Sequence, residues 1–386
     1  MARIYVDARN IKGEPSGVGR YASSLIPELC RQTGHEVVVI RHGSNRRPLV
    51  EGEQGWEEIF VEGEIDDLKG WLLGHRVLEA AFARGGRPDL YHSLFHVVPR
   101  KVRRAIGEAG LVTTAHDFLW IDEADASQGT YWKARGIEVF AKRAIPQALR
   151  ESNRVIAISE PTRRRARAYV DDQKVEVISH GVDAAFFEAP GPLEGEFREL
   201  GRRPYVVAIG NSKEYKNLGV LVGAFERWRE QGREVDLVLV GDCEGLHGRV
   251  SQVEESERIT VTGYVDDQRL RSLLGNAAVF AFPSKVEGFG LPLLEAMAMG
   301  VPVICSGVEP MESIGGQAVL YFDPDEPEEV AHLVGRLVED GSLRRRMVSR
   351  GRRRAEEFRW EKTAGATLQV YEAVLGSGSM GLRTPK

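Results

Sequence analysis

Residues 282–302 read FPSKVEGFGLPLLEAMAMGVP and predict a buried strand, a glycine-rich loop and a helix in succession. The apolar strand ends at Pro283, and Gly288 and Gly290 let the backbone of the loop approach a ligand closely. Leu291 begins the helix, so the loop amides and the positive end of the helix dipole can face one anion. This arrangement is typical of a parallel α/β domain that binds its ligand at the carboxyl end of a strand.

Two carboxylates flank this anion site. Glu287 lies on the loop and Glu295 on the helix eight residues later, so they can bind different parts of one extended ligand. This suits a sugar nucleotide, whose hydroxyl groups flank a diphosphate. Glycoside hydrolases also use two carboxylates, but those flank a single bond, and the anion-binding loop would then have no purpose. The pattern therefore favours a nucleotide-sugar enzyme over a hydrolase.

Apolar runs alternate with helical segments along the rest of the chain, which predicts βα units and parallel sheets. Strands are predicted over residues 3–6, 37–40, 111–115 and 155–158 in a first series, and over 205–209, 237–240, 259–261, 279–282 and 301–304 in a second. A turn-rich stretch around Ala189 separates the two series. We expect two doubly wound α/β domains, 1–184 and 204–358, joined by a linker over 185–203.

The end of the chain is predicted to be helical over residues 327–338, 342–358 and 360–375. We expect residues 359–376 to form a last helix and 377–386 to form a disordered tail. The arginine-rich stretch 344–354 lies at helical spacing beside Glu356 and Glu357, which favours a solvated helix face over a nucleic-acid site.

The composition is typical of a globular protein. Of its 386 residues, 42% are apolar and 28% charged, and no apolar run approaches the ~20 residues of a membrane-spanning helix. The formal net charge of −5 gives no sign of nucleic-acid binding. The first residues lack the apolar stretch of a signal peptide, so we expect a cytoplasmic protein. Cys30, Cys243 and Cys305 are far apart and predict buried thiols rather than disulfides or a zinc site.

A second glycine-rich stretch, SGVGRYA at residues 16–22, opens a helix after the first strand and formally matches a dinucleotide-binding fingerprint. Nine residues, 8–16, precede Gly17 after the strand, and Arg41 rather than an acid follows the second strand, which argues against NAD(P). The amides of Gly17 and Gly19 can still meet a phosphate or sugar oxygen at the helix start. The alternative is a glycine-rich turn without a ligand.

Polar residues follow the predicted strand over 111–115. His116 and Asp117 come where open α/β sheets bind their ligands. A histidine at a strand end can equally be a structural hydrogen-bonding group, and His92 and His96 are weaker candidates of the same kind. The position alone leaves both interpretations open.

Two lysines, Lys213 and Lys216, lie at a helix start beyond the predicted strand over 205–209. Cations are unfavourable there because of the helix dipole, unless an anion binds between them. A bound diphosphate would remove the conflict. The alternative is that both are surface lysines without a ligand.

Together these motifs resemble those of the retaining glycosyltransferases of family 4, which have the GT-B fold of two Rossmann-like domains facing each other across a cleft. The chain is similar in particular to bacterial mannosyltransferases of polysaccharide assembly. The resemblance covers nearly all of residues 1–376 and rests on SGVGRY at 16–21, His116-Asp117, Ser159 with Thr162, HGVD at 180–183, Lys216-Asn217, TGY at 262–264, and the E-x7-E segment from Glu287 to Glu295 with GVP at 300–302.

The resemblance implies a role for each matching residue of the donor site. Glu295 would bind the ribose hydroxyls, Lys216 the diphosphate, and Glu287 the hydroxyls of the transferred sugar. Further contacts to phosphate, sugar and base are expected from Phe289, Gly290, Leu291 and Tyr264.

Gly17, Gly19 and His116 would face the reaction centre from the first domain. The family usually places an arginine a few residues before the motif lysine, whereas this chain has Asn211-Ser-Lys213 there. Asn211 and Lys213 are therefore the donor-binding candidates in that region, and Lys213 would replace the arginine without its bidentate fork.

The resemblance further implies transfer of a hexosyl unit with retention, by front-face attack and without a covalent enzyme intermediate. Lys216 and the helix-terminus amides would stabilise the departing phosphate. We recognise no Asp-x-Asp pair placed to hold a divalent ion, so we expect neither metal nor cofactor. GDP-mannose is favoured over UDP-glucose as donor, with a sugar, a glycolipid or a polysaccharide precursor as acceptor.

Other functions on the same fold stay open. An epimerase would convert the donor sugar without an acceptor, a phosphorylase would need inorganic phosphate, and a non-catalytic binding protein would leave the donor intact. Arg163, Arg164 and Arg165 lie in the acceptor domain and allow a peripheral contact with the inner face of a membrane. The alternative for these three arginines is an exposed helix face.

Overall fold

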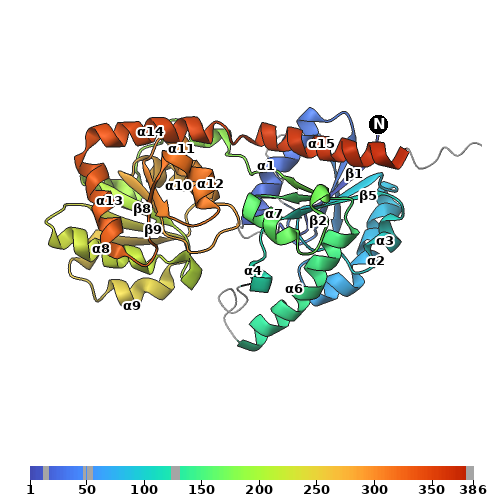
Figure 1. The fold of residues 1–386 in the computed structure, drawn as a ribbon, viewed down its shortest axis with the longest axis horizontal. Helices are drawn as coiled ribbons and strands as arrows, with labels where there is room; N and C mark the ends of the chain where they lie inside the picture. The colour runs from blue at the N-terminus through green and yellow to red at the C-terminus, as the bar shows by residue number, and fades with distance from the viewer. Residues whose placement is uncertain (12–16, 47–48, 50–54, 123–130, 380–386) are drawn as a thin grey trace, which may run out of the picture. The chain divides into compact units, whose positions relative to one another are not determined.

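The computed structural model of the chain describes residues 1–11, 17–46, 49, 55–122 and 131–379. The chain divides into two compact units, one formed by residues 1–181 with the segment from Trp360 onward, the other by residues 182–359 (Figure 1). Each unit is a parallel β-sheet with helices packed on it. Within the described ranges, no helix combines the length and the hydropathy needed to cross a membrane.

The described part of the first unit contains a seven-stranded sheet in the order β3-β2-β1-β4-β5-β6-β7. Its strands are β1 (Arg3–Asp7), β2 (Glu36–His42), β3 (Glu57–Val61), β4 (Leu90–Ser93), β5 (Gly110–Ala115), β6 (Arg154–Ala157) and β7 (Val175–Val177). Its helices are α1 (Gly17–Gln32), α2 (Leu68–Gly85), α3 (Val102–Ile106), α4 (Leu119–Asp122), α6 (Tyr131–Glu151), α7 (Glu160–Ala166), the 3₁₀ turn η1 (Asp172–Lys174) and α15 (Trp360–Ser379). The central strands are buried along their length, as parallel strands covered on both faces are.

Helix α15 comes from the end of the chain and packs beside α1 on the sheet of the first unit. Trp360, Tyr371 and Val374 share one apolar core with Ile4 and Leu25. Tyr371 also forms a hydrogen bond of 2.6 Å with Nδ1 of His92 on β4. The helix continues through residues 377–379, which were expected to begin the disordered tail, and residues 380–386 lie outside the described ranges.

The second unit contains a six-stranded sheet in the order β10-β9-β8-β11-β12-β13. Its strands are β8 (Tyr205–Ile209), β9 (Asp236–Val240), β10 (Ile259–Gly263), β11 (Val279–Phe282), β12 (Val303–Ser306) and β13 (Leu320–Phe322). Its α-helices are α8 (Gly219–Glu230), α9 (His247–Val250), α10 (Asp267–Gly275), α11 (Leu291–Met299), α12 (Met311–Gly315), α13 (Pro327–Glu339) and α14 (Gly341–Ala355). Its 3₁₀ turns are η2 (Ala184–Phe187), η3 (Gly195–Arg202), η4 (Glu214–Lys216), η5 (Glu244–Leu246), η6 (Ser256–Arg258) and η7 (Gly316–Ala318).

The parallel α/β architecture predicted from the alternating pattern is confirmed, and the strands over 205–209 and 279–282 have the predicted bounds. The strand predicted over 301–304 instead covers 303–306, because Pro302 has no N–H to donate and contributes only its carbonyl, which accepts from Phe280 N. Strands β3, β4, β7 and β13 were not predicted. Three of these lie at or next to a sheet edge and have partly exposed residues, so their apolar runs are short.

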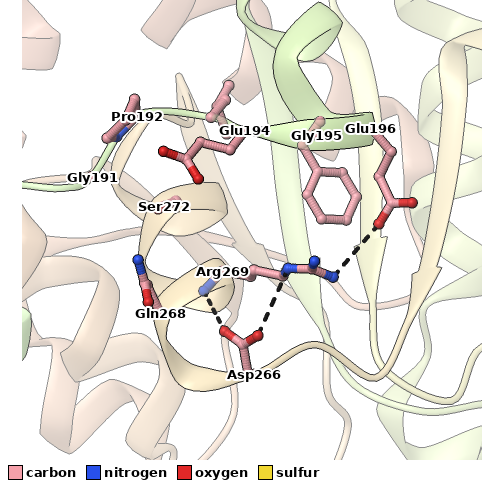
Figure 2. Close-up of a pocket in the computed structure, with 11 residues that line it drawn as sticks. Gly191, Pro192, Glu194, Gly195, Glu196, Asp266, Gln268, Arg269 and Ser272 are labelled. Atoms are coloured by element: carbon pink, nitrogen blue, oxygen red, sulfur yellow. Dashed lines mark hydrogen bonds and ion pairs between the residues drawn. The ribbon is translucent and has the colours of Figure 1, made fainter.

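The stretch expected to be a linker, residues 185–203, is packed against the second unit. It contains η2 and η3, and their aromatic residues Phe186 and Phe197 are buried. Gly191 to Phe197 and the first turns of α10 line a pocket of about 460 Å³, where Arg269 lies between Asp266 and Glu196 (Figure 2). The turn-forming residues predicted a break in regular structure. The segment is nevertheless held against the second unit, because its two phenylalanines are buried.

Candidate active site

Lys216 and Glu287 meet at the carboxyl edge of the second sheet. Lys216 ends η4, which follows β8, and Glu287 lies in the loop that follows β11, the strand next to β8. The Lys216 Nζ atom is 2.5 Å from Glu287 Oε1, and the two side chains are 18% and 13% exposed. Neighbouring parallel strands thus bring two candidate residues from distant motifs into an ion pair.

Asn217 holds the two loops in this position. Its backbone is left-handed, with φ of 51°, a conformation that asparagine adopts more readily than most residues. Its side-chain amide donates to the carbonyl oxygens of Pro283 and Pro324, at 3.3 and 2.6 Å. Lys285 N also donates to Tyr215 O at 2.8 Å. The ion pair therefore lies on a backbone that is fixed from both sides.

Helix α11 begins beside this pair. Its N-cap residue is Gly290, whose φ of +112° would strain any residue with a Cβ, and the helix then starts with Leu291 and Pro292. Gly290 has no side chain to accept from the helix start, Pro292 has no N–H, and Leu293 N donates to Gly290 O at 3.1 Å, so the Leu291 amide is the donor available to an anion. Phe289 is buried and packs on Phe358 at 6.2 Å between ring centroids, which anchors the loop.

Glu295 lies in the second turn of α11. Its side chain is buried, with 1% of the residue exposed. Glu287 and Glu295 therefore differ in environment, since one is in a partly exposed loop and the other in the helix interior. The ribose contact implied for Glu295 stays a prediction.

The other donor-site candidates of the second unit are exposed or partly exposed. Asn211 Oδ1 accepts from Lys213 N at 3.1 Å, which closes a tight turn after β8. The Nζ atoms of Lys213 and Lys216 lie 6.0 and 5.4 Å from the centroid of the same ring, that of Tyr215. Tyr264 follows β10 and is 69% exposed.

His116 is buried at the carboxyl end of β5 in the first unit. Its Nε2 lies 2.8 Å from the carbonyl oxygen of Leu94, and since a carbonyl only accepts, Nε2 carries the proton. Burial lowers the pKa of His116 to about 4. The ring is therefore neutral near pH 7, with the lone pair on Nδ1, and it packs against Tyr21 and His180.

The glycine motif and the two weaker histidine candidates have different surroundings. Helix α1 begins at Gly17, Gly19 is buried, and Ser16 of the motif lies outside the described residues. His92 is held between Tyr371 and Thr114, with Nε2 2.8 Å from Thr114 Oγ1, so its role is structural. His96 is buried, and neither of its ring nitrogens has a hydrogen-bond partner among the described residues.

A buried ion pair at the end of β1 was not among the predicted site residues. Arg9 and Asp7 are both fully buried, with Arg9 Nη2 2.6 Å from Asp7 Oδ2, and the Tyr91 hydroxyl donates to the same carboxylate. The signal was available in the sequence, because two charged residues directly follow an apolar strand. A buried pair of this kind fixes the strand end, since removing either partner leaves an uncompensated charge.

Two findings concern metal binding. Among the described residues, no group of three or more His, Cys, Asp or Glu side chains is arranged to hold a metal ion. The chain does contain one Asp-x-Asp sequence after β13, Asp323-Pro-Asp325, which the sequence analysis did not recognise. Asp325 forms an ion pair with Lys285, and Asp323 accepts from the backbone amide of Asp325.

Comparison with known proteins identifies the family. Residues 15–186 match the family described as Glycosyltransferase Family 4, and residues 194–354 match Glycosyl transferases group 1. The phosphatidyl-myo-inositol mannosyltransferase of Mycobacterium tuberculosis H37Rv is 30% identical over 381 residues, which cover 95% of each chain. The chain belongs to this glycosyltransferase family. O-antigen chain mannosyltransferase B of Escherichia coli is 25% identical over 390 residues, covering 96% of this chain and 99% of the relative.

Solved structures agree with the GT-B fold. Sucrose-phosphate synthase (tll1590) from Thermosynechococcus elongatus aligns with a TM-score of 0.79 at 20% identity, over 98% of this chain and all of the other. Anabaena Alr3699/HepE, solved in complex with UDP and glucose, aligns with a TM-score of 0.76 at 16% identity, over 97% and 100%. The predicted fold and the predicted membership of a glycosyltransferase family are confirmed.

Proposed function

We propose that this glycosyltransferase moves a mannosyl unit, with retention of configuration, from a nucleotide-diphosphate sugar to a sugar, glycolipid or polysaccharide-precursor acceptor. The ion pair between Lys216 and Glu287, beside the start of α11, is the observation that carries the proposal. The pair and the helix start together supply a cation, a carboxylate and the Leu291 amide at one edge of the sheet. A diphosphate sugar needs these three groups, because its phosphates are anionic and its sugar hydroxyls donate hydrogen bonds.

Donor binding would exchange the partners within the Lys216–Glu287 pair. The Lys216 ammonium turns to the diphosphate, and the Glu287 carboxylate accepts hydrogen bonds from hydroxyls of the transferred sugar. Neither charge is left without a partner before or after binding, which limits the cost of desolvating the pair. Lys213, 6.0 Å from the Tyr215 ring centroid that Lys216 also approaches, provides the second cation.

During transfer, negative charge grows on the departing phosphate while positive charge grows on the sugar. Lys216, Lys213 and the amides of Gly290 and Leu291 stabilise the phosphate electrostatically. The acceptor hydroxyl attacks the anomeric carbon, the bond from that carbon to the phosphate oxygen breaks, and the acceptor proton passes to this oxygen. We propose that this step requires no metal ion or cofactor.

His116 would assist from the first unit as a neutral group. Its Nε2 proton is donated to Leu94 O, so its Nδ1 accepts a hydrogen bond from a hydroxyl of the substrate. Because burial keeps its pKa at about 4, it does not act as a cationic acid near neutral pH. Gly17 and Gly19 at the start of α1 would offer backbone amides to the same substrate.

The choice of mannose rests on relatives of nearly full length that are named mannosyltransferases, at 25–30% identity. The proposed base contact of Tyr264 rests on its exposure after β10. A cytoplasmic location and a role in polysaccharide assembly belong to the same proposal.

Membrane contact through Arg163, Arg164 and Arg165 is a separate part of the proposal. Arg163 pairs with Asp172, and Arg165 pairs with Asp122, which reduces the positive charge available to an anionic surface. Sedimentation with vesicles of anionic lipid, at low and high salt, tests this contact directly. Binding that is lost when all three arginines become Gln supports it, and absence of binding at low salt contradicts it.

The activity itself is tested by incubating the full chain with GDP-mannose or UDP-glucose and mannoside acceptors. Release of nucleoside diphosphate, a product that contains the donor sugar, and an α-linkage by NMR are the expected results. Conversion of the donor sugar without acceptor, or a dependence on inorganic phosphate, would instead indicate an epimerase or a phosphorylase. A β-linked product would contradict retention. Glu287→Gln is the matched variant, and we expect it to be less active than the unaltered chain.

A further inference from the structure

A groove of about 870 Å³ lies at the edge of the second sheet that is opposite the candidate active site. Pro204, Ala278 and Pro302, which line it, each precede a strand, namely β8, β11 and β12. Lys216 and Glu287 instead follow the strands β8 and β11. The groove is therefore separated from the donor site by the length of the sheet, and helix α14 forms its other wall.

Four arginines of α14 line this groove: Arg344, Arg345, Arg352 and Arg353. Arg345, Arg352 and Arg353 are exposed, and Arg344 is partly exposed. The described residues that line the groove include no aspartate or glutamate. The groove is thus strongly cationic although the protein as a whole carries a formal charge of −5.

These four arginines are not neutralised by neighbouring acids. Within the described residues, no carboxylate lies within ion-pair distance of any of them, and the side chains of Arg345 and Arg353 make no hydrogen bond either. Arg344 donates to the carbonyl oxygens of Leu337 and Val338 at 3.1 Å, and Arg352 to that of Met299 at 3.4 Å. The solvated helix face expected from the sequence is confirmed, because most arginines of residues 344–354 are exposed, and Arg354 pairs with Glu357.

The start of the helix makes two of these charges unfavourable, whereas Arg352 and Arg353 lie in the last turn, where the dipole favours cations. Arg344 and Arg345 lie in the first turns of α14, where the helix dipole disfavours cations. Asp340, the N-cap residue, accepts from the amides of Ser342 and Leu343, and these hydrogen bonds lower its pKa. Its carboxylate is therefore already occupied by the helix start. A bound anion would relieve the repulsion among the arginines, and this is the physical reason to expect one.

The spacing of the arginines indicates how far apart the anionic groups of a ligand would lie. Arg345 and Arg352 are seven residues apart, two helical turns or about 10 Å along the axis. Between them the groove is lined by Val348 and Ser349, and its floor is apolar at Ala278 and Pro302. Guanidinium groups bind phosphate oxygens in a bidentate manner, more specifically than a lysine does.

We propose that this groove binds a small phosphorylated metabolite that carries an anionic group at each end. One phosphate lies at Arg344 and Arg345, the other at Arg352 and Arg353, and the carbon skeleton lies over Val348. The inference does not depend on the function proposed above. Arg352 also donates to Met299 O, at the end of the helix that carries Glu295, so a bound ligand would be linked to that helix through Arg352.

Calorimetry on the full chain tests the proposal with fructose 1,6-bisphosphate, fructose 6-phosphate and inorganic phosphate as probes. We expect the bisphosphate to bind at least about tenfold more tightly than the monophosphate, because it engages both arginine pairs. The double variant Arg345→Gln and Arg353→Gln shortens two exposed side chains that make no hydrogen bond or ion pair with the described residues, so it is expected to fold normally. It is expected to weaken bisphosphate binding by about tenfold or more.

The matched control is Arg346→Gln with Arg350→Gln, which removes the same charge from the same helix outside the groove. Near-normal binding by the control supports the proposal. An equal loss in both double variants would indicate non-specific attraction and overturn it, as would absence of binding at low salt. Lys216→Ala is expected to leave the bisphosphate affinity unchanged. Loss of binding in that variant would show that the bisphosphate binds at the donor site, and it would overturn the proposal.

Discussion

Lys216 Nζ lies 2.5 Å from Glu287 Oε1, although the two residues are 71 positions apart in the chain. Both side chains are mostly shielded from water, so removing one charge leaves the other without a partner and without full hydration. In the proposed reaction the same two groups bind the diphosphate and the sugar. Substitution of either residue therefore affects stability and turnover by different amounts, and the two effects can be separated.

Lys216→Ala is expected to lower kcat with GDP-mannose by about 10²–10³-fold, because the charge is lost where negative charge develops. It is expected to lower the free energy of unfolding by only about 1–3 kcal/mol, the cost of leaving Glu287 without its partner. Steady-state kinetics and urea unfolding measure the two quantities. Adding Glu287→Gln to this variant should recover stability but not activity.

Lys213→Ala is the control for this prediction. Lys213 is exposed and makes no ion pair with the described residues, so its loss is expected to reduce kcat less and to leave stability unchanged. An active Lys216→Ala enzyme together with an inactive Lys213→Ala enzyme would show that the wrong lysine was assigned to the diphosphate.

Glu295→Ala is expected to weaken binding of the nucleoside diphosphate by about 10–150-fold. The reason is that two ribose hydroxyls lose a charged acceptor of a kind worth about 1.5–3 kcal/mol. Titration of GDP by calorimetry measures this. Glu295→Gln keeps the shape of the side chain and one acceptor oxygen, so an intermediate affinity is expected. Unchanged GDP affinity in folded Glu295→Ala would disprove the ribose assignment.

Activity is expected to persist in excess EDTA. The proposed charge stabilisation comes from Lys216, Lys213 and the start of α11, and Asp325 of the Asp-x-Asp sequence pairs with Lys285. Initial rates before and after chelation, with Mg²⁺ and Mn²⁺ added back, measure this. Loss of activity on chelation, with recovery of activity when Mg²⁺ is added back, would contradict the prediction. Asp323→Asn and Asp325→Asn would then be the first variants to examine.

Local sequence patterns predicted most of the second unit. The glycine loop follows β11 and the helix begins at Leu291 as predicted, because strand, loop and helix each carry their own short-range signal. The proximity of Lys216 to Glu287 depended on strand order, since β8 and β11 are neighbours in the sheet but separated by two strands in the sequence. Sequence spacing alone does not contain that order.

Charge neutralisation was harder to predict than fold. The stretch 344–354 was predicted to be a solvated helix face, and its exposed arginines confirm this, but Arg345 and Arg353 also line a groove with the residues that precede three strands. Arg163 and Arg165, for which either a membrane contact or an exposed helix face was predicted, are paired with Asp172 and Asp122. Asp122 is 43 residues away from Arg165, so tertiary structure decided both cases.

The last prediction concerns acid stability and His96. Burial lowers the pKa of His96 to about 3, well below the usual 6.5, and His116 contributes in the same direction. Between these two pH values the unfolded chain binds a proton that the folded chain does not, so the free energy of unfolding falls as the pH falls from 6.5.

The variant His96→Phe tests this, because it preserves the ring packing against Phe95 and Trp120 and removes the group that binds the proton in the unfolded chain. Urea unfolding at pH 7, 6, 5 and 4.5 is expected to show equal or higher stability at pH 7 and a slope smaller by up to about 1.4 kcal/mol per pH unit. His332→Gln, at an exposed position on α13, is the matched control and should leave the slope unchanged. An unaltered slope in His96→Phe would mean that His96 gains its proton in the folded chain as readily as in the unfolded one, and that its surroundings admit water.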